Sequence, residues 1–365
     1  MKFILPVLLI LHGAIHLLGF VKAFHLAPVE QLKMPISKTS GIFWLLTFIL
    51  FLIAAISLLA KADWWYVPVC TGLLLSTILI LFAWQDAKFG MIPNVIILVV
   101  AISSYATVNF YNVYQVDVQT AVLQTNTIST SILSEADISG LPVPVQKYIR
   151  YTGSVGKPKV NNFKMEFSGG IRKNAQSAWM PFTTEQYNFV EASKRLFFMK
   201  ASMYHIPVAG YHSFKNGIAF MDIRLLSLFT VQYQDGKEMN VAETVTFFND
   251  LCCMAPATLI DKRINWLEVK GNNVKASFTN NNISISAWLY FNDKGELINF
   301  ISDDRFAVSD QSTMRQVPWS TPLKDYKVIN GHKLASFAEL IYHYPEGDFC
   351  YGTFKLKSIV YNAVK

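Results

Sequence analysis

Four long apolar segments in the first third of the chain constrain its fold more than any other feature. They are 19 or 20 residues long and nearly free of charge, and they cover residues 3–21, 41–60, 66–84 and 91–110. About 20 helical residues are needed to cross a hydrocarbon core of about 30 Å. We therefore expect residues 1–110 to form a domain of four transmembrane helices.

The overall composition agrees with a membrane protein. Of the 365 residues, 52% are hydrophobic and only 16% are charged, whereas an average soluble domain has about 25% charged residues. The formal net charge of +7 is spread over the chain, with an excess of three positive charges in residues 1–110 and of four in the remainder. So diffuse an excess is not typical of a nucleic-acid-binding protein.

The first apolar segment has an alternative interpretation as a cleaved signal peptide. Lys2 precedes it, and Val21-Lys22-Ala23 loosely resembles a cleavage site. The length of the segment, its two histidines and the lysine inside the supposed site argue for a retained helix.

The distribution of lysines predicts the orientation of the chain, because lysine-rich flanks of transmembrane helices stay in the cytoplasm. With four spans, Lys2 and Lys61 lie on the side of the two termini, and residues 89–146 contain no Lys or Arg. The other side carries Lys22, Lys33, Lys38 and Lys88. We expect a multi-pass membrane protein whose C-terminal domain lies outside the cytoplasm. Cleavage of the first segment would leave three spans and place that domain inside.

Two histidines lie in the middle of the first apolar segment. His12 and His16 are four residues apart, so they share one face of the expected helix. One hypothesis makes them ligands of a haem or metal, or a proton relay, because imidazole suits these roles. The alternative is that each imidazole binds a neighbouring helix or a lipid headgroup. No third ligand is identifiable, so no metal site is assigned.

The segment between the third and fourth expected spans is predicted to form a turn at the membrane interface. It contains Trp84, Asp86 and Lys88, and Asn94 follows at the start of the next helix. Trp and charged residues are typical of this depth. A second interpretation, in which Asp86 orients a histidine of the first span, is disfavoured because His12 lies near the centre of the bilayer.

The chain changes character after residue 110. Residues 111–155 are expected to form a linker with short helices, since Ser134 to Asp137 fits a capping box and Pro144 suits the first turn of a second helix. Residues 156–365 alternate apolar and polar side chains between turn signals spaced about 7 to 12 residues apart, which is typical of antiparallel hairpins. Residues 238–254 are the exception and have helical periodicity.

These patterns predict an α+β membrane protein: a four-helix transmembrane bundle followed by a large antiparallel β-meander or half-barrel with one inserted helix. A sheet of this size must cover an apolar face, and curled sheets commonly enclose a cavity. Phenylalanines distributed over the strands, Phe182 among them, are candidates for its lining or for ordinary core.

Charged and thiol side chains in the β-domain form no recognisable catalytic motif, and phosphate-binding, hydrolase and metalloprotease signatures are absent from the sequence. Arg305 follows Asp303 and Asp304, which could suggest acid and base roles. Only Asp303 and Arg305 would share a face of the strand, and a cross-strand ion pair at the sheet edge is expected instead. Glu243 and Asp250 align on the inserted helix without an identifiable partner. Cys350 is a candidate to bridge one of the adjacent pair Cys252 and Cys253.

Two stretches of the β-domain resemble an uncharacterised bacterial family of membrane-anchored β-domains. The first runs from Leu141 to Tyr148 and continues in Trp179-Met180-Pro181-Phe182 and Gln186; the second comprises residues 243–256, Trp266, Arg305 and Tyr351-Gly352. The architecture is similar to periplasmic half-barrels that carry lipoproteins. The resemblance implies a fold and a location in the bacterial inner membrane rather than a chemistry. With the membrane histidines, the candidate ligand-binding residues are His12, His16, Trp179, Phe182, Gln186 and Arg305.

The sequence supports three alternative hypotheses about the function of the protein. The leading hypothesis is a binding protein whose external β-domain holds a lipid or another hydrophobic molecule near the membrane, without a cofactor. The second is a membrane redox or ligand-handling enzyme that uses His12 and His16. The third is an envelope protein that acts through a protein partner. The absence of catalytic motifs favours a protein that is not an enzyme.

Overall fold

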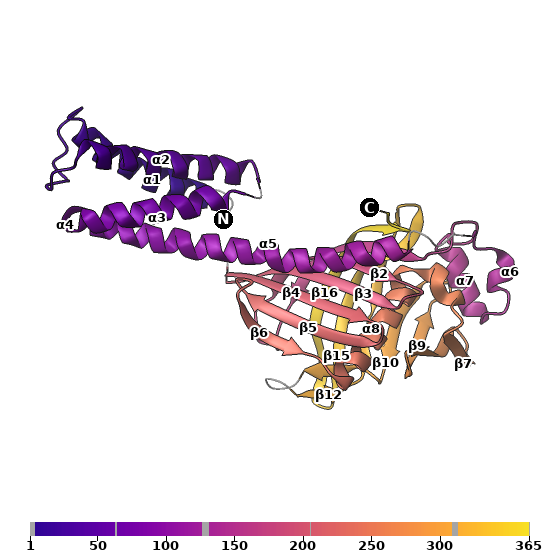
Figure 1. The fold of residues 1–365 in the computed structure, drawn as a ribbon. Helices are drawn as coiled ribbons and strands as arrows, with labels where there is room; N and C mark the ends of the chain where they lie inside the picture. Colours follow the sequence, from indigo (N-terminus) through magenta and orange to yellow (C-terminus); the bar gives the residue numbers. More distant parts are fainter. Residues whose placement is uncertain (1–3, 63, 126–130, 205, 309–312, 365) are drawn as a thin grey trace. The chain divides into compact units, whose positions relative to one another are not determined.

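The computed structural model describes residues 4–62, 64–125, 131–204, 206–308 and 313–364. The chain divides into two compact units, Met1–Val108 and Asn109–Lys365. The first unit is helical, and the second consists mainly of antiparallel strands (Figure 1). This confirms the α+β class expected from the sequence.

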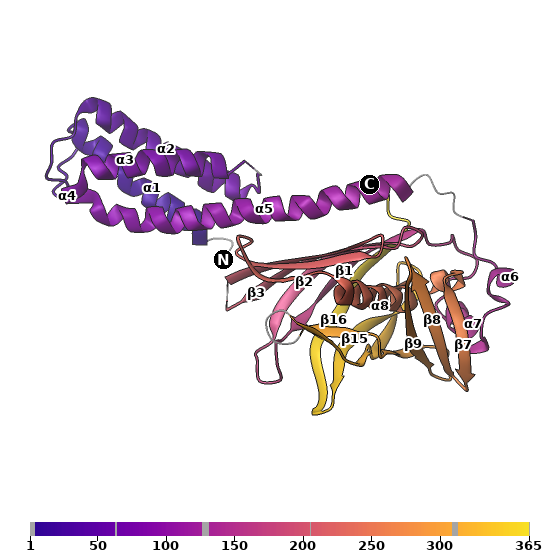
Figure 2. The same ribbon diagram turned by 60° about the horizontal axis from the view of Figure 1, so that its bottom comes forward.

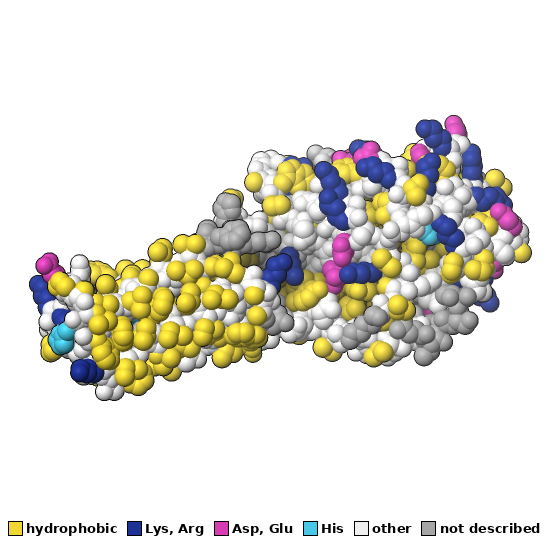
Figure 3. Space-filling model, turned by 90° about the horizontal axis from the view of Figure 1, so that it is seen from above, with side chains coloured by type: hydrophobic (Ala, Val, Ile, Leu, Met, Phe, Trp, Pro, Cys, Tyr) yellow, Lys and Arg dark blue, Asp and Glu magenta, His cyan; other side chains and the backbone are white. Residues whose placement is uncertain are grey.

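Helices occupy all four predicted apolar segments of the first unit. They are α1 (Ile4–Ala23), α2 (Lys38–Leu59), α3 (Tyr66–Phe82), the short α4 (Trp84–Ala87), the 3-10 helix Lys88–Gly90 and the first half of α5 (Met91–Thr125). Within the described residues, three segments are long and apolar enough to cross a membrane: Leu5–Ala23, Lys38–Leu59 and Trp84–Thr125. α3 is apolar but shorter, with 17 residues. Figure 3 shows hydrophobic side chains over most of the face of this unit that is in view.

Small residues let α1 and α2 approach closely. A Cβ atom added to Gly19 would lie 2.3 Å from the ring of Trp44, and one added to Gly41 would lie 2.4 Å from the Cβ of Ala23. Neither position has room for a larger side chain. Membrane helices associate through such close contacts because burial from lipid supplies little hydrophobic driving force.

The second unit contains a 14-stranded antiparallel sheet and a separate two-stranded ribbon, β11 with β12. The strands are β1 (Asn162–Ile171), β2 (Met180–Phe189), β3 (Lys194–Met203), β4 (Ile206–Lys215), β5 (Ile218–Leu225), β6 (Phe229–Gln234), β7 (Ile264–Lys270), β8 (Asn273–Asn280), β9 (Ile283–Phe291), β10 (Leu297–Ser302), β11 (Phe306–Val308), β12 (Met314–Gln316), β13 (Trp319–Ser320), β14 (Leu323–Ile329), β15 (His332–Tyr344) and β16 (Gly347–Tyr361).

The strand order differs from a single meander in one respect. Two runs of hairpins, β1 to β6 and β7 to β16, join through the pairing of β1 with β16. The first and last strands of the unit therefore lie side by side within the sheet. Consequently β6 and β7, which are consecutive in sequence, form its two edges.

The inserted helix α8 (Lys237–Met254) connects these two edge strands. Its bounds match the predicted helix at residues 238–254 within one residue. Figure 2 shows α8 inside the curve of the sheet. Its buried side chains, including Phe247, Phe248 and Leu251, belong to a core shared with several strands. A buried helix explains how so large a sheet covers its concave face.

The predicted linker forms ordered structure in its described parts. The C-terminal half of α5 packs on the sheet, where Phe110, Tyr114 and Val118 share a buried cluster with residues of β2, β3 and β4. α6 (Glu135–Ile138) begins with the predicted capping box of Ser134 and Asp137. α7 (Val143–Tyr151) follows.

Candidate functional site

A cavity of about 1000 Å³ lies in the β-rich unit, between α8 and the strands around it. Its walls come from both runs of hairpins and from α8. This volume is at the upper end of the range of about 300–1,000 Å³ for small-molecule sites. The curled sheet and α8 thus border a hollow that is partly open to solvent, where the sequence suggested a cavity.

Methionine is the most frequent residue in the lining of the cavity. Seven of the eleven methionines in the chain face the cavity: Met180, Met199, Met203, Met221, Met239, Met254 and Met314. The flexible thioether side chain adapts to irregular shapes and packs against many ligands. The wall therefore suits an apolar ligand without a fixed shape.

A network of buried charges crosses one side of the cavity. Arg195 on β3 donates from Nη1 to Oε2 of Glu243 at 3.0 Å and from Nε to Oδ2 of Asp250 at 2.8 Å. Both carboxylates come from α8, where Glu243 and Asp250 are separated by about two helical turns and so lie on the same side of the helix. The network thereby fastens α8 to the sheet.

Burial and charge act in opposite directions on these carboxyl groups. Burial opposes ionisation of Glu243, but the positive charge of Arg195 outweighs it and holds the pKa below the usual value. Burial raises the pKa of Asp250, although Arg195 opposes this shift. Burial also lowers the pKa of the nearby His212 to about 4, so this histidine is neutral at pH 7.

The predicted residue Gln186 belongs to this network. Its Nε2 donates to Oδ2 of Asp250 and to Oδ1 of Asn188, both at 2.6 Å, and its Oε1 accepts from Nη2 of Arg195 at 3.3 Å. Gln186 lines the cavity, but its polar atoms are already engaged with neighbouring side chains.

Arg305 also faces the cavity, between β10 and β11. Its guanidinium carbon lies 5.5 Å from the ring centroid of Trp319. Arg305 does not form the expected cross-strand ion pair, since no carboxylate of the described residues lies within 4.0 Å of it. The chain leaves the strand after Ser302, and residues 303–305 lack the alternation of a strand. Asp304 instead accepts a hydrogen bond of 2.7 Å from the backbone N–H of Ser286.

The predicted residues Trp179 and Phe182 occupy different positions relative to the cavity. Trp179 lines it, with the guanidinium carbon of Arg172 4.5 Å from its ring centroid. Phe182 does not line the cavity. It is buried against Phe197, which does line the cavity. The structure therefore brings Trp179, Gln186 and Arg305 to one cavity and places Phe182 in its support.

His12 and His16 belong to the helical unit, where they form a buried polar network. Nε2 of His12 lies 2.7 Å from Oδ1 of Asn94, and Nε2 of His16 lies 2.9 Å from Oγ of Ser76. Nδ1 of His16 donates to the backbone oxygen of His12 at 2.9 Å. These contacts match the alternative in which the imidazoles bind neighbouring helices. Among the described side chains, no group of three or more His, Cys, Asp or Glu is placed to hold a metal ion.

The predicted interface turn divides into two environments. Trp84 is exposed, whereas Asn94 is buried among the histidines. Asp86 accepts hydrogen bonds from the backbone N–H groups of Lys33 and Met34, at 2.6 and 2.8 Å, and so fixes the segment that leads to α2.

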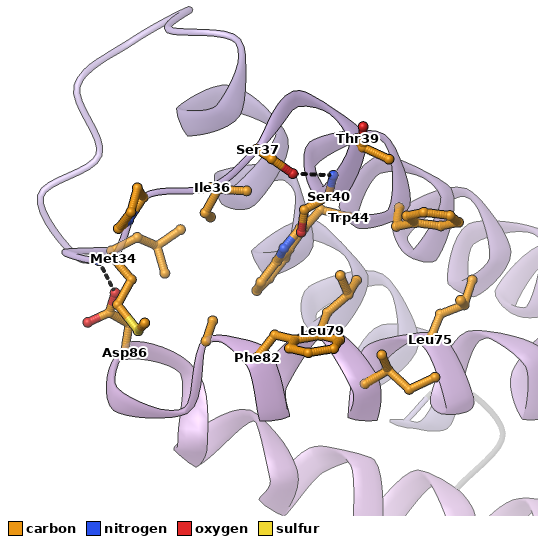
Figure 4. A pocket seen from close by; sticks show the side chains of 15 residues that line it. Met34, Ile36, Ser37, Thr39, Ser40, Trp44, Leu75, Leu79, Phe82 and Asp86 are labelled. Carbon is orange, nitrogen blue, oxygen red and sulfur yellow. Dashed lines mark hydrogen bonds between the residues drawn. The ribbon is translucent and has the colours of Figure 1, made fainter.

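Figure 4 shows the hydrogen bond from the backbone N–H of Met34 to Asp86, which lies beside a second pocket of about 620 Å³. This pocket is lined mostly by apolar side chains, which come from α2, from α3 and from the segment before α2, and include Trp44, Leu79 and Phe82 (Figure 4). The side chain of Lys88 lies 5.4 Å from the ring centroid of Phe89.

All four cysteines are free thiols. Cys252 and Cys253 are buried on α8, while Cys350 lies on β16 and its thiol is 3.6 Å from the backbone oxygen of Gly352. The suggested bridge from Cys350 is therefore not formed.

Sequence reasoning missed Arg195, which organises the polar side of the cavity. The signal available was indirect: two aligned carboxylates on α8 required a buried cation. Lys194 and Arg195 were both available at the start of one strand, and only the inward orientation of Arg195 in the curled sheet distinguishes them.

Comparisons with known proteins place the β-rich unit in a family. A model described as a family of unknown function (DUF6544) matches residues 131–354, more than half of the chain. No curated protein matches the chain. A solved structure of a DUF1329 family protein from Desulfovibrio piger is similar over 60% of this chain and 91% of its own, with 11% sequence identity and a TM-score of 0.35. The expectation of an uncharacterised β-domain family is confirmed.

Proposed function

The chain belongs to this family of unknown function, and we propose that it is a membrane-anchored protein whose β-rich unit binds a lipid or a similar apolar molecule. The observation that carries the proposal is the cavity of about 1000 Å³ with its methionine-rich wall. Small-molecule sites are concave, mostly apolar hollows of this size with a few polar groups in the wall. We therefore interpret this partly open hollow between α8 and the sheet as a binding site.

The residues that contact the ligand follow from the lining. We assign direct contact to Trp179 and Arg305, whose side chains face the cavity, and a supporting role to Phe182. Gln186 reaches the cavity through the network around Arg195, so it shapes the polar wall.

The anchor is the helical unit. Three of its helices are long and apolar enough to cross a membrane, and we propose that α3 completes a bundle of four spans within residues 1–110. Residues 111–155 then link this bundle to the β-domain of residues 156–365. The positions of the lysines support an orientation in which that domain lies outside the cytoplasm of a bacterial cell.

A reporter tests this orientation. Alkaline phosphatase fused after Lys365 is expected to be active, because it folds only outside the cytoplasm. A fusion that is inactive, while a cytoplasmic reporter at the same position is active, contradicts the proposed topology but leaves the cavity untouched.

Ligand binding is tested on the full chain in an uncharged detergent. A photoreactive 16-carbon alcohol is added, and the labelled peptides are identified by mass spectrometry. We expect label on peptides that line the cavity. Ile223 faces the cavity on β5, and Ile223→Trp should fill part of it and reduce labelling several-fold.

The matched control is Ile298→Trp, which makes the same change at an exposed position of β10 outside the cavity. Its labelling should equal that of the unmodified chain. Label distributed equally over peptides outside the cavity, with no lipid extracted from the purified chain, would refute lipid binding. A single protein crosslinked to the β-domain under those conditions would favour the interaction role.

A further inference from the structure

The two arginines on the polar side of the cavity differ in how they are paired. Arg195 forms ion pairs with Glu243 and Asp250. Arg305 forms none with any carboxylate of the described residues within 4.0 Å. Arg195 therefore has two anionic partners, and Arg305 has no direct one within the described part of the chain.

The hydrogen-bonding groups of Arg305 are also incompletely used. Its Nε is buried and has no partner among the described residues. Nη1 makes one long bond of 3.4 Å to the backbone oxygen of Phe306. A guanidinium carries five N–H donors, and buried donors without partners are costly. Because Nε is itself buried, the donors that a ligand can reach are those of the terminal nitrogens, which also lie near the hydroxyl of Tyr351.

The surroundings hold Arg305 in place without neutralising it. Trp319 packs against the guanidinium, and Nε1 of Trp319 donates to the hydroxyl of Tyr351 at 3.2 Å. The ring of Tyr351 stacks on Tyr342, with a centroid separation of 4.7 Å. Rigid aromatic groups thus fix the cation at the wall, which lowers the entropic cost of binding an anion there.

The charges along the described lining have a positive excess. The basic side chains are Arg172, Lys173, Arg195 and Arg305, and the acidic ones are Glu243 and Asp250. Both acids are bonded to Arg195. An anion that enters the cavity therefore meets Arg305 without a competing carboxylate in direct contact.

From this pairing we infer that the ligand is an anionic amphiphile, with its carboxylate or phosphate bound by Arg305 and its hydrocarbon chain against the methionine-rich wall. The inference rests on the proposed function and adds the charge of the ligand. Guanidinium groups bind carboxylate and phosphate through paired, charge-assisted hydrogen bonds.

Competition for the photoreactive alcohol tests the inference on the full chain in uncharged detergent. Palmitate, dipalmitoyl phosphatidic acid and uncharged hexadecanol are compared as competitors. We expect each bound anion to compete at a concentration about tenfold or more below that of hexadecanol, as one charge-assisted contact allows. If only palmitate reaches this ratio, the ligand is a free fatty acid. If only phosphatidic acid reaches it, the ligand is a phospholipid.

Arg305→Gln should retain labelling by the alcohol. In this variant the concentrations at which the anion and hexadecanol compete should differ by no more than about twofold. Arg305→Lys should keep part of the preference, because the charge remains. The matched control is Arg315→Gln: this exposed arginine lies 4.7 Å from the ring of Tyr344 but does not line the cavity. It should behave like the unmodified chain.

The outcomes separate the two proposals. If no probe labels the cavity, the proposed function fails. If the alcohol labels it but neither anion competes better than hexadecanol, lipid binding stands and the anionic ligand is refuted. An equal loss of preference in Arg305→Gln and Arg315→Gln also refutes the assignment to Arg305.

Discussion

Arg195 on β3 and Glu243 on α8 form an ion pair of 3.0 Å in which the side chains are only 8% and 2% exposed. The pair joins the inserted helix to the first run of hairpins, on the wall of the cavity. Since the partners are 48 residues apart, the position of α8 depends on a contact between distant parts of the chain.

Removing the cation from this pair should destabilise the β-rich unit. Arg195→Met leaves two carboxylates buried without their partner, and we expect a loss of about 3–5 kcal/mol in the free energy of unfolding. Denaturant titration of the full chain in detergent, followed by circular dichroism of the strands, measures it. The control Arg150→Met breaks an exposed pair with Glu135 and should have a much smaller effect. Equal losses in the two variants would show that the buried pair has no special role.

The histidine network should stabilise the helical unit through coupled contacts. His12→Ala and Asn94→Ala each remove one side of the 2.7 Å contact, so their effects should be less than additive, with a coupling of about 0.5–2 kcal/mol. Unfolding of the full chain in mixed detergent micelles gives the double-mutant cycle. Additive effects would contradict a direct bond.

The same histidine variants distinguish packing from ligation. Because the ring nitrogens of His16 are occupied by Ser76 and the backbone of His12, the visible absorbance and metal content of purified His16→Ala should equal those of the unmodified chain. A lost absorbance band or metal would instead support the redox hypothesis.

The stability of the β-rich unit should decrease as the pH falls from 6.5 to 4. Burial lowers the pKa of His332 to about 4, so in this window the unfolded chain binds a proton that the folded chain does not. His332→Phe should reduce the loss of unfolding free energy between pH 7 and pH 5 by roughly 1 kcal/mol. Denaturant titrations at both pH values measure the difference. An identical pH dependence in the variant would rule out His332 as a contributor.

The cysteines of α8 should be protected from alkylation in the folded protein. Cys252 and Cys253 are buried, and burial raises the pKa of both thiols well above the usual value. Since the thiolate is the reactive form, iodoacetamide should modify them only after denaturation, as intact-mass spectrometry would show. Rapid modification under native conditions would indicate that α8 leaves the core.

The sequence by itself determined the local features of this protein. Long apolar runs require helices because only internal hydrogen bonds satisfy the backbone away from water, and the predicted helices at residues 143–151 and 238–254 follow from proline placement and apolar periodicity. Alternation and turn residues likewise indicated antiparallel strands. Each of these patterns involves residues that are close together in the sequence, so it predicts local structure without knowledge of the fold.

Only the tertiary structure decided which distant residues meet. The pairing of β1 with β16 sets the two edges of the sheet, and α8 joins them. This arrangement brings Arg195 to Glu243 and Asp250 of α8, whereas Arg305 has no carboxylate within 4.0 Å among the residues that the structure describes. Likewise Asn94, assigned to an interface turn, contacts His12 across 82 positions of sequence. These relations depend on how the sheet curls and the helices pack, and no local pattern of residues encodes them.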